Sequence, residues 1–146
     1  MKIHNINLDS EVNENLFHLA VGNFDGVHLG HQKIIKQLVS NASKDNKPSA
    51  ILSFYPHPRQ FFSRSLDYYQ IIGLEKKQQL LKDLGITDLF FLHFDQSIAN
   101  LSPSDFISKI IVQKLKVKKL LVGYDFRFGK NRDGDTLLLK DHSDIH

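Results

Sequence analysis

Four short apolar runs constrain the fold most strongly. They cover residues 17–21, 50–54, 88–92 and 120–122. None shows the regular polar alternation of a strand with one solvent face, so each is expected to be covered on both faces. Such strands, alternating with amphipathic helices, are typical of a parallel sheet between two helical layers. The sequence therefore predicts an α/β fold: an open parallel sheet with helices on both faces.

Three segments between these runs carry helix signals. The first has apolar residues at helical spacing, namely Ile34, Ile35, Leu38, Val39 and Ala42. The second, residues 74–84, ends before Gly85, which suits a left-handed cap. The third begins with Ser102 as N-cap, Pro103 at the first helical position and Asp105 at the capping-box position. It places Phe106, Ile107, Ile110 and Ile111 on one side.

Length and composition fit one domain over residues 1–146, with 41% hydrophobic and 24% charged residues. A net charge of +3 is too small to indicate a polybasic nucleic-acid-binding or membrane-binding protein. The chain has no cysteine, which excludes disulfides and Cys-type zinc sites. The polar first 15 residues lack the apolar core of a signal peptide. We therefore expect a cytoplasmic protein with no nucleic-acid or membrane partner.

The segment 22–31, GNFDGVHLGH, lies between the first apolar run and the first helix. In open parallel sheets ligands bind beyond the carboxyl ends of the strands, and the free N–H groups of a following helix favour an anion. Gly22, Gly26 and Gly30 allow the backbone to approach a phosphate closely. His28 and His31 are three residues apart, which places both imidazoles on one side of the first helical turn. The pattern predicts a phosphate site.

Other interpretations of this segment remain open. Its spacing differs from the GxGxxG dinucleotide motif and from the GxxxxGK[ST] P-loop. The glycines and histidines could be turn and capping residues without a ligand. A zinc site is disfavoured because histidine ligands on a helix usually lie four apart and need further partners. No metal-ligating residues are therefore predicted.

Two further loops follow strands. Residues 53–58, SFYPHP, contain two prolines that fix an extended backbone, and alone they could be a rigid loop. The aromatic residues beyond them could cover the core or stack on a ring: Phe61, Phe62, Tyr68 and Tyr69. In residues 122–135, Arg127 and Arg132 could bind phosphate oxygens. A hairpin-like turn with solvated charges is the alternative.

Together the three motifs resemble those of flavin-specific adenylyltransferases. Residues 22–31 resemble the HxGH signature of nucleotidylyltransferases in its GxFDGxHxGH form. Residues 53–58 resemble TFxPHP, with Ser53 in place of the usual threonine, and residues 122–135 resemble VGxDFRFGxxRxGD. The likeness spans about residues 17–135. The chain resembles the FMN adenylyltransferase domain of bacterial riboflavin kinase/FAD synthetases, which implies a Rossmann-like nucleotidylyltransferase fold.

The resemblance implies an enzyme that makes FAD and pyrophosphate from FMN and ATP with Mg²⁺. It assigns the stabilisation of charge during transfer to His28 and His31. It assigns ATP binding to Gly22, Asn23, Phe24, Asp25, Gly26, Gly30 and Arg127. It assigns FMN binding to Pro56, His57, Pro58, Phe62, Phe106, Asp125 and Phe128.

The family pattern continues into an ISSTxxR-like segment and a separate riboflavin kinase barrel, and neither is found in this sequence. We therefore expect residues 1–146 to be a domain that is incomplete at its carboxyl end, in which nucleotide binding persists better than turnover. Three alternatives remain: a catalytically silent ATP- or flavin-binding module, another HxGH adenylyl- or cytidylyltransferase, and a protein without a ligand. The sequence does not determine the oligomeric state.

Overall fold

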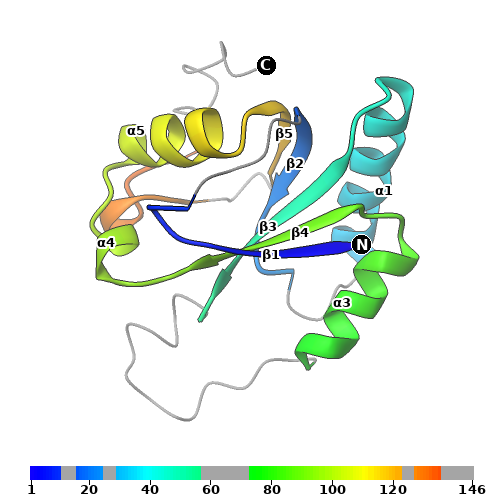
Figure 1. The fold of residues 1–146 in the computed structure, drawn as a ribbon, viewed down its shortest axis with the longest axis horizontal. Helices are drawn as coiled ribbons and strands as arrows, with labels where there is room; N and C mark the ends of the chain where they lie inside the picture. The colour runs from blue at the N-terminus through cyan, green and yellow to red at the C-terminus, as the bar shows by residue number, and fades with distance from the viewer. Residues whose placement is uncertain (11–15, 25–28, 57–72, 123–126, 136–146) are drawn as a thin grey trace.

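In the computed structural model, five parallel strands form one sheet in the order β1-β4-β3-β2-β5 (Figure 1). The strands are β1 (Lys2–Ile6), β2 (Phe17–Val21), β3 (Ser49–Tyr55), β4 (Asp88–His93) and β5 (Val117–Leu121). The structure describes residues 1–10, 16–24, 29–56, 73–122 and 127–135. The predicted open parallel sheet is confirmed.

Helices cover both faces of the sheet (Figure 1). One face carries α1 (Leu29–Lys44) and α3 (Leu74–Asp83), and the other carries the short helices α4 (Gln96–Ala99) and α5 (Pro103–Asp105). The chain of α5 continues directly into a π-helical segment, η1 (Phe106–Lys114). A short 3₁₀ turn, η2 (Lys130–Arg132), follows β5. The predicted arrangement of layers is therefore confirmed.

Each face of the sheet has its own buried cluster because successive strand residues point to opposite sides. In β3, Leu52 packs with the η1 side, whereas its neighbour Ile51 packs with the α1 and α3 side. In β4, Phe90 and Leu89 divide in the same way. A strand buried on both faces has no polar side, which explains the uninterrupted apolar runs of the sequence.

The predicted ends of two helices are confirmed. The Ser102 hydroxyl accepts a hydrogen bond from the Asp105 amide at 3.1 Å, as an N-cap does. Gly85 has a φ of 99° just after α3, which explains why a glycine stands there. The π-helical width of η1, in which the Leu115 amide bonds the Ile110 carbonyl at 2.9 Å, was not predicted.

The sequence-based boundaries were wrong at both edges of the sheet. β1 was missed because it is an edge strand whose residues are mostly solvent-accessible and polar, with only Ile6 buried. β5 was predicted over residues 120–122 but runs from Val117 to Leu121. The first half of β5 was not predicted because Lys118 and Lys119 interrupt the apolar run. An edge strand tolerates such exposed charges, whereas an inner strand does not.

At the amino end of β2, a buried histidine approaches an acidic residue. His18 is 1% exposed, and its Nε2 lies 2.9 Å from an Asp45 carboxylate oxygen. The Nζ atoms of Lys118 and Lys119 lie 3.6 and 3.4 Å from the same oxygen. Burial lowers the pKa of His18, outweighing the hydrogen bond and charge of Asp45, which act to raise it.

The lowered pKa of His18 predicts a loss of stability in mild acid. The unfolded chain binds a proton on the His18 imidazole more readily than the folded chain does. The contribution of neutral His18 to the free energy of unfolding is therefore complete above the unfolded pKa of about 6.5 and is lost as pH falls below it. We expect the free energy of unfolding, measured in urea, to decrease from about pH 7.5 to about pH 5.5. His18→Gln should flatten this slope, whereas His93→Gln at an exposed position should keep it. Equal slopes for His18→Gln and the unsubstituted protein would contradict the prediction.

Candidate functional site

The strand order places a topological switch point between β2 and β5. The chain passes from β2 to β3 and β4 on one side of β2, and then returns to place β5 on its other side. The carboxyl ends of two neighbouring strands whose connections leave in opposite directions are where open α/β sheets bind ligands. Here those ends lead into segment 22–31 after β2 and segment 122–135 after β5. Two of the three predicted motifs therefore begin at the switch point between β2 and β5.

Three hydrogen bonds from the end of β3 hold the turn after β2. The Gly22 amide donates to the Leu52 carbonyl at 3.0 Å, which extends the ladder between the two strands. The Ser53 hydroxyl donates to the Gly22 carbonyl at 2.9 Å. The Phe54 amide donates to Asn23 Oδ1 at 3.1 Å. The first and second predicted motifs thus contact one another directly.

Two predicted site residues lie on the first turn of α1. Gly30 is exposed, and His31 is half-buried. The ring of Phe24, which is buried and has a φ of 53°, meets the His31 ring edge to face at a centroid distance of 5.1 Å. Packing against Phe24 limits the orientations of the imidazole, which suits a side chain that must meet a ligand in one geometry.

Two residues predicted to bind FMN lie in the core of the η1 side. Phe106 and Phe128 are 3% and 5% exposed, and their ring centroids lie 5.5 Å apart. The Phe54 ring lies 6.2 Å from Phe106, so Phe54 contacts this pair through its ring and the Gly22 turn through its amide. Phe54 joins the two predicted binding regions. It was not singled out from the sequence, although it lies inside the SFYPHP motif.

The loop after β5 folds back on itself. Phe128 and Gly134 form an antiparallel bridge, with both backbone hydrogen bonds made, at 3.2 and 2.9 Å. The exposed Arg127 lies 3.8 Å from the Asp135 carboxylate, a separation at which solvent screens the pair. The hairpin-like turn considered from the sequence is therefore present. The Arg127 side chain lies on the surface and not in the core.

Gly129 fixes this loop against the start of α5. Its φ is 77°, and a Cβ there would lie 2.8 Å from both the nitrogen and the Cα of Pro103. The Lys130 amide beside it donates to the Leu101 carbonyl at 2.6 Å. A side chain at this position would have an unfavourable backbone conformation and would also overlap the backbone of α5.

We expect Gly129→Ala to lower the free energy of unfolding by about 1–3 kcal/mol, the usual range for strain at one such residue. Gly73→Ser is the matched control because a Cβ there meets no atom within 4 Å and serine is well accepted at the N-cap position that Gly73 occupies before α3. The control should stay within about 0.5 kcal/mol of the original protein. Urea unfolding of the three proteins checks both values. Equal unfolding midpoints for Gly129→Ala and the original protein would contradict this account of the loop.

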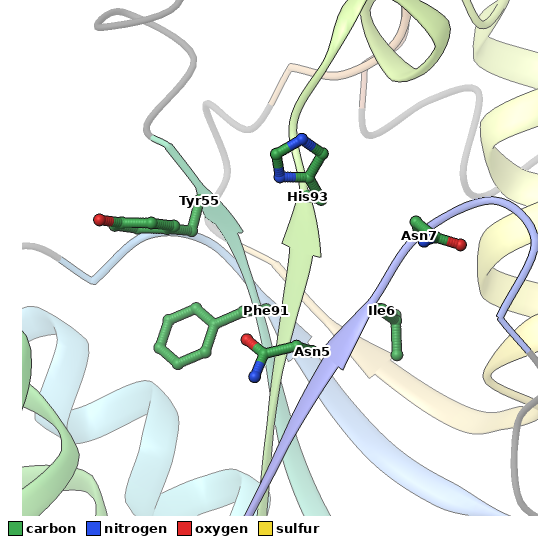
Figure 2. A pocket seen from close by; sticks show the side chains of 6 residues that line it. All are labelled: Asn5, Ile6, Asn7, Tyr55, Phe91 and His93. Atoms are coloured by element: carbon green, nitrogen blue, oxygen red, sulfur yellow. The ribbon is translucent and has the colours of Figure 1, made fainter.

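A cavity with a volume of ≈ 160 Å³ lies at the carboxyl ends of β1, β3 and β4, and Figure 2 shows the side chains that line it. It is lined by Asn5, Ile6, Asn7, Tyr55, Phe91 and His93. Pockets for ligands of ordinary size hold about 300–1,000 Å³, so this cavity is too small for a nucleotide or flavin. The predicted site residue Pro56 directly follows Tyr55, which lines this cavity and is the last residue of β3. The peptide bond between Tyr55 and Pro56 is cis.

The remaining predicted site residues lie outside the described residues: Asp25, Gly26, His28, His57, Pro58, Phe62 and Asp125. Within the described ranges, no group of three or more metal-ligating side chains could hold a metal ion. Among the helices in those same ranges, none is long and apolar enough to cross a membrane.

Two residues near the Gly22 turn were missed as functional candidates. Ser53 was recognised as a motif residue, but its bond to Gly22 depends on the register between β2 and β3. Lys77 was treated as part of a helix, yet it is 6% exposed and donates to Ser53 Oγ at 3.3 Å. A lysine between polar neighbours gives no sequence signal of burial, since lysine is almost never fully buried.

A sequence model of the family described as FAD synthetase matches residues 10–146, which is nearly the whole chain. The chain belongs to the FAD synthetase family. The family resemblance predicted from the three motifs is thereby confirmed.

Bifunctional riboflavin kinase/FMN adenylyltransferases are similar to this FAD synthetase-family chain. The Escherichia coli (strain K12) protein is 38% identical over 122 residues, which cover 84% of this chain and 39% of that protein. The Bacillus subtilis (strain 168) protein is 35% identical over 127 residues, with 86% and 40% covered. The Buchnera aphidicola (subsp. Schizaphis graminum) protein is 34% identical over 139 residues, with 95% and 43% covered. The chain spans about two fifths of the length of these relatives.

A crystal structure described as a macrolide-efflux protein from Streptococcus pneumoniae superposes on this chain with a TM-score of 0.81. The match covers 97% of this chain and 55% of that one, at 23% sequence identity. At this identity the likeness shows a shared fold and nothing further. It confirms the α/β fold of this FAD synthetase-family chain.

Proposed function

We propose that residues 1–146 form an FMN adenylyltransferase domain that makes FAD and pyrophosphate from FMN and ATP. The observation that carries the proposal is the switch point between β2 and β5, because the GNFDGVHLGH and DFRFG motifs follow the ends of these two strands in the sequence. The family match and the bifunctional relatives support the flavin specificity. FMN and ATP are accordingly the proposed substrates.

In the proposed reaction, an oxygen of the FMN phosphate attacks the α-phosphorus of ATP. The bond between that phosphorus and the oxygen bridging to the β-phosphate breaks, and pyrophosphate leaves with the electron pair. Negative charge builds on the phosphate oxygens during this step. His28 and His31 would stabilise that charge by donating hydrogen bonds from the start of α1. No covalent intermediate is required.

The rest of the site would position the substrates. The Gly22–Phe24 turn, fixed by β3, would hold ATP together with Asp25, Gly26 and Gly30, and Arg127 would contact the phosphates. Pro56, Phe106 and Phe128 would face the flavin with the residues outside the described ranges: His57, Pro58, Phe62 and Asp125. Mg²⁺ would arrive with ATP, held mainly by the phosphates, and would neutralise their charge.

The test is to incubate the protein with ATP, FMN and Mg²⁺ and to quantify FAD by chromatography and pyrophosphate by a coupled assay. Equal amounts of FAD and pyrophosphate are expected. Calorimetry with ATP and FMN, each added separately, belongs to the same experiment. Binding of both without FAD formation would show a silent binding module. Turnover with CTP, or with glycerol phosphate or phosphopantetheine instead of FMN, would show another HxGH transferase.

A further inference from the structure

Lys77 of α3 is the one described lysine that is both buried and joined to the predicted nucleotide turn. It is 6% exposed, whereas its neighbour Lys76 is exposed. Burial of an ammonium group is costly, so a lysine is retained in a core only where polar contacts compensate it. The Lys77 Nζ donates to the hydroxyl of Ser53, which is 0% exposed.

From Ser53 a second hydrogen bond leads directly to the turn after β2. The Ser53 Oγ lies 3.3 Å from the Lys77 Nζ and donates to the Gly22 carbonyl at 2.9 Å. Ser53 therefore accepts from the ammonium on one side and donates to the turn on the other. A hydroxyl with a charged donor behind it is polarised and forms a stronger bond to its own acceptor.

The relay reaches the turn that follows β2, at the switch point of the sheet. It joins the carboxyl end of β3 to the first residue of segment 22–31, beside the Asn23 bond to Phe54. Lys77 and Ser53 are both buried, so the ammonium charge is screened less here than it is in solvent. The Lys77 ammonium is connected to this turn by two successive hydrogen bonds, and its positive charge favours negative charge at the turn.

We propose that Lys77 is a positioning residue for the polyphosphate of the nucleotide. Through Ser53 it sets the conformation of the Gly22 turn. Its buried positive charge strengthens the binding of the phosphates but not that of the base and sugar. This inference rests on the proposed ATP-binding function of the same turn.

The test compares Mg-ATP with adenosine, which shares the base and sugar but has no phosphate. Lys77→Met keeps the length of the side chain and removes its charge. We expect calorimetry to show about a 10-fold or greater loss of ATP affinity. Adenosine affinity should change by less than about 2-fold. Lys77→Arg should recover part of the ATP affinity, and Lys76→Met, the matched control on the same helix, should bind ATP normally.

Equal losses for ATP and adenosine, or no loss for either, would overturn the inference, since a purely structural lysine cannot distinguish ligands by their phosphates. If circular dichroism shows that Lys77→Met does not fold, Ser53→Ala serves as the test. It removes the hydroxyl of the relay and should weaken ATP binding but not adenosine binding; unchanged ATP affinity would overturn the inference. Absence of ATP binding by the unsubstituted protein would overturn the proposed function as well, whereas normal binding with an unaffected Lys77→Met variant would overturn only the role of Lys77.

Discussion

Replacing His28 and His31 together with alanine should lower the rate of FAD formation by about 10³-fold or more while leaving the protein folded. Loss of a single preorganised donor to a developing charge commonly costs about 10²- to 10³-fold in rate. His31 is half-buried on the first turn of α1, and alanine removes its single edge-to-face ring contact with Phe24, worth about 0.5–1.5 kcal/mol. The effect should therefore fall mainly on catalysis, with the protein still folded.

The rate of pyrophosphate release with ATP and FMN measures the effect, and thermal unfolding followed by circular dichroism monitors the fold. His93→Ala changes an exposed histidine on β4 and is the matched control, with an unchanged rate. A doubly substituted protein that retains more than about a tenth of the original rate would rule out the proposed role of the two histidines.

Phe106→Ala should lower the free energy of unfolding by about 3–5 kcal/mol, as truncation of a fully packed phenylalanine does. Phe106 is 3% exposed, and its ring packs against Phe54 and Phe128 at the start of η1. Phe106→Leu keeps most of the volume and should cost less than about 1.5 kcal/mol. Urea unfolding separates the two variants. A loss below about 1 kcal/mol for Phe106→Ala would contradict the packing described here.

The same pair of variants tests whether Phe106 also faces the flavin. Phe106→Leu retains the fold but has no aromatic ring to stack on isoalloxazine. FMN titration should then show about a 5-fold or greater loss of affinity, equivalent to about 1 kcal/mol of lost aromatic contact. Unchanged FMN affinity would assign Phe106 to the core alone.

The inner part of the fold was predictable because burial on both faces leaves a strong sequence signal. β2 was predicted with its observed boundaries, and β3 and β4 each lacked only one or two end residues. The edges were not predictable in this way. β1 and the first half of β5 carry charged and polar residues that an edge strand accepts, and nothing local distinguishes them from a loop. The π-helical form of η1 depends on backbone bonding that side-chain periodicity does not report.

The candidate site was predictable where it consists of local motifs. The positions of Gly22 and Pro56 just after strands, and of His31 at the start of the helix that follows β2, follow from the order of elements along the sequence. What the sequence could not show is which distant residues these motifs touch. The bond from Ser53 to Gly22 and the burial of Lys77 both depend on the pairing of β2 with β3 and on the packing of α3.

The position of β5 determines when the proposed binding site can form during synthesis on the ribosome. β2 pairs with β5 across about 100 residues, so the ribosome releases β2, β3 and β4 well before β5. Until residues 117–121 emerge, the Gly22 turn has β3 on one side and no strand on the other. The proposed binding site at this switch point is therefore among the last parts of the molecule to form. ATP or FMN should stabilise the finished sheet by mass action but should not assist its earlier stages, when the binding site is still incomplete.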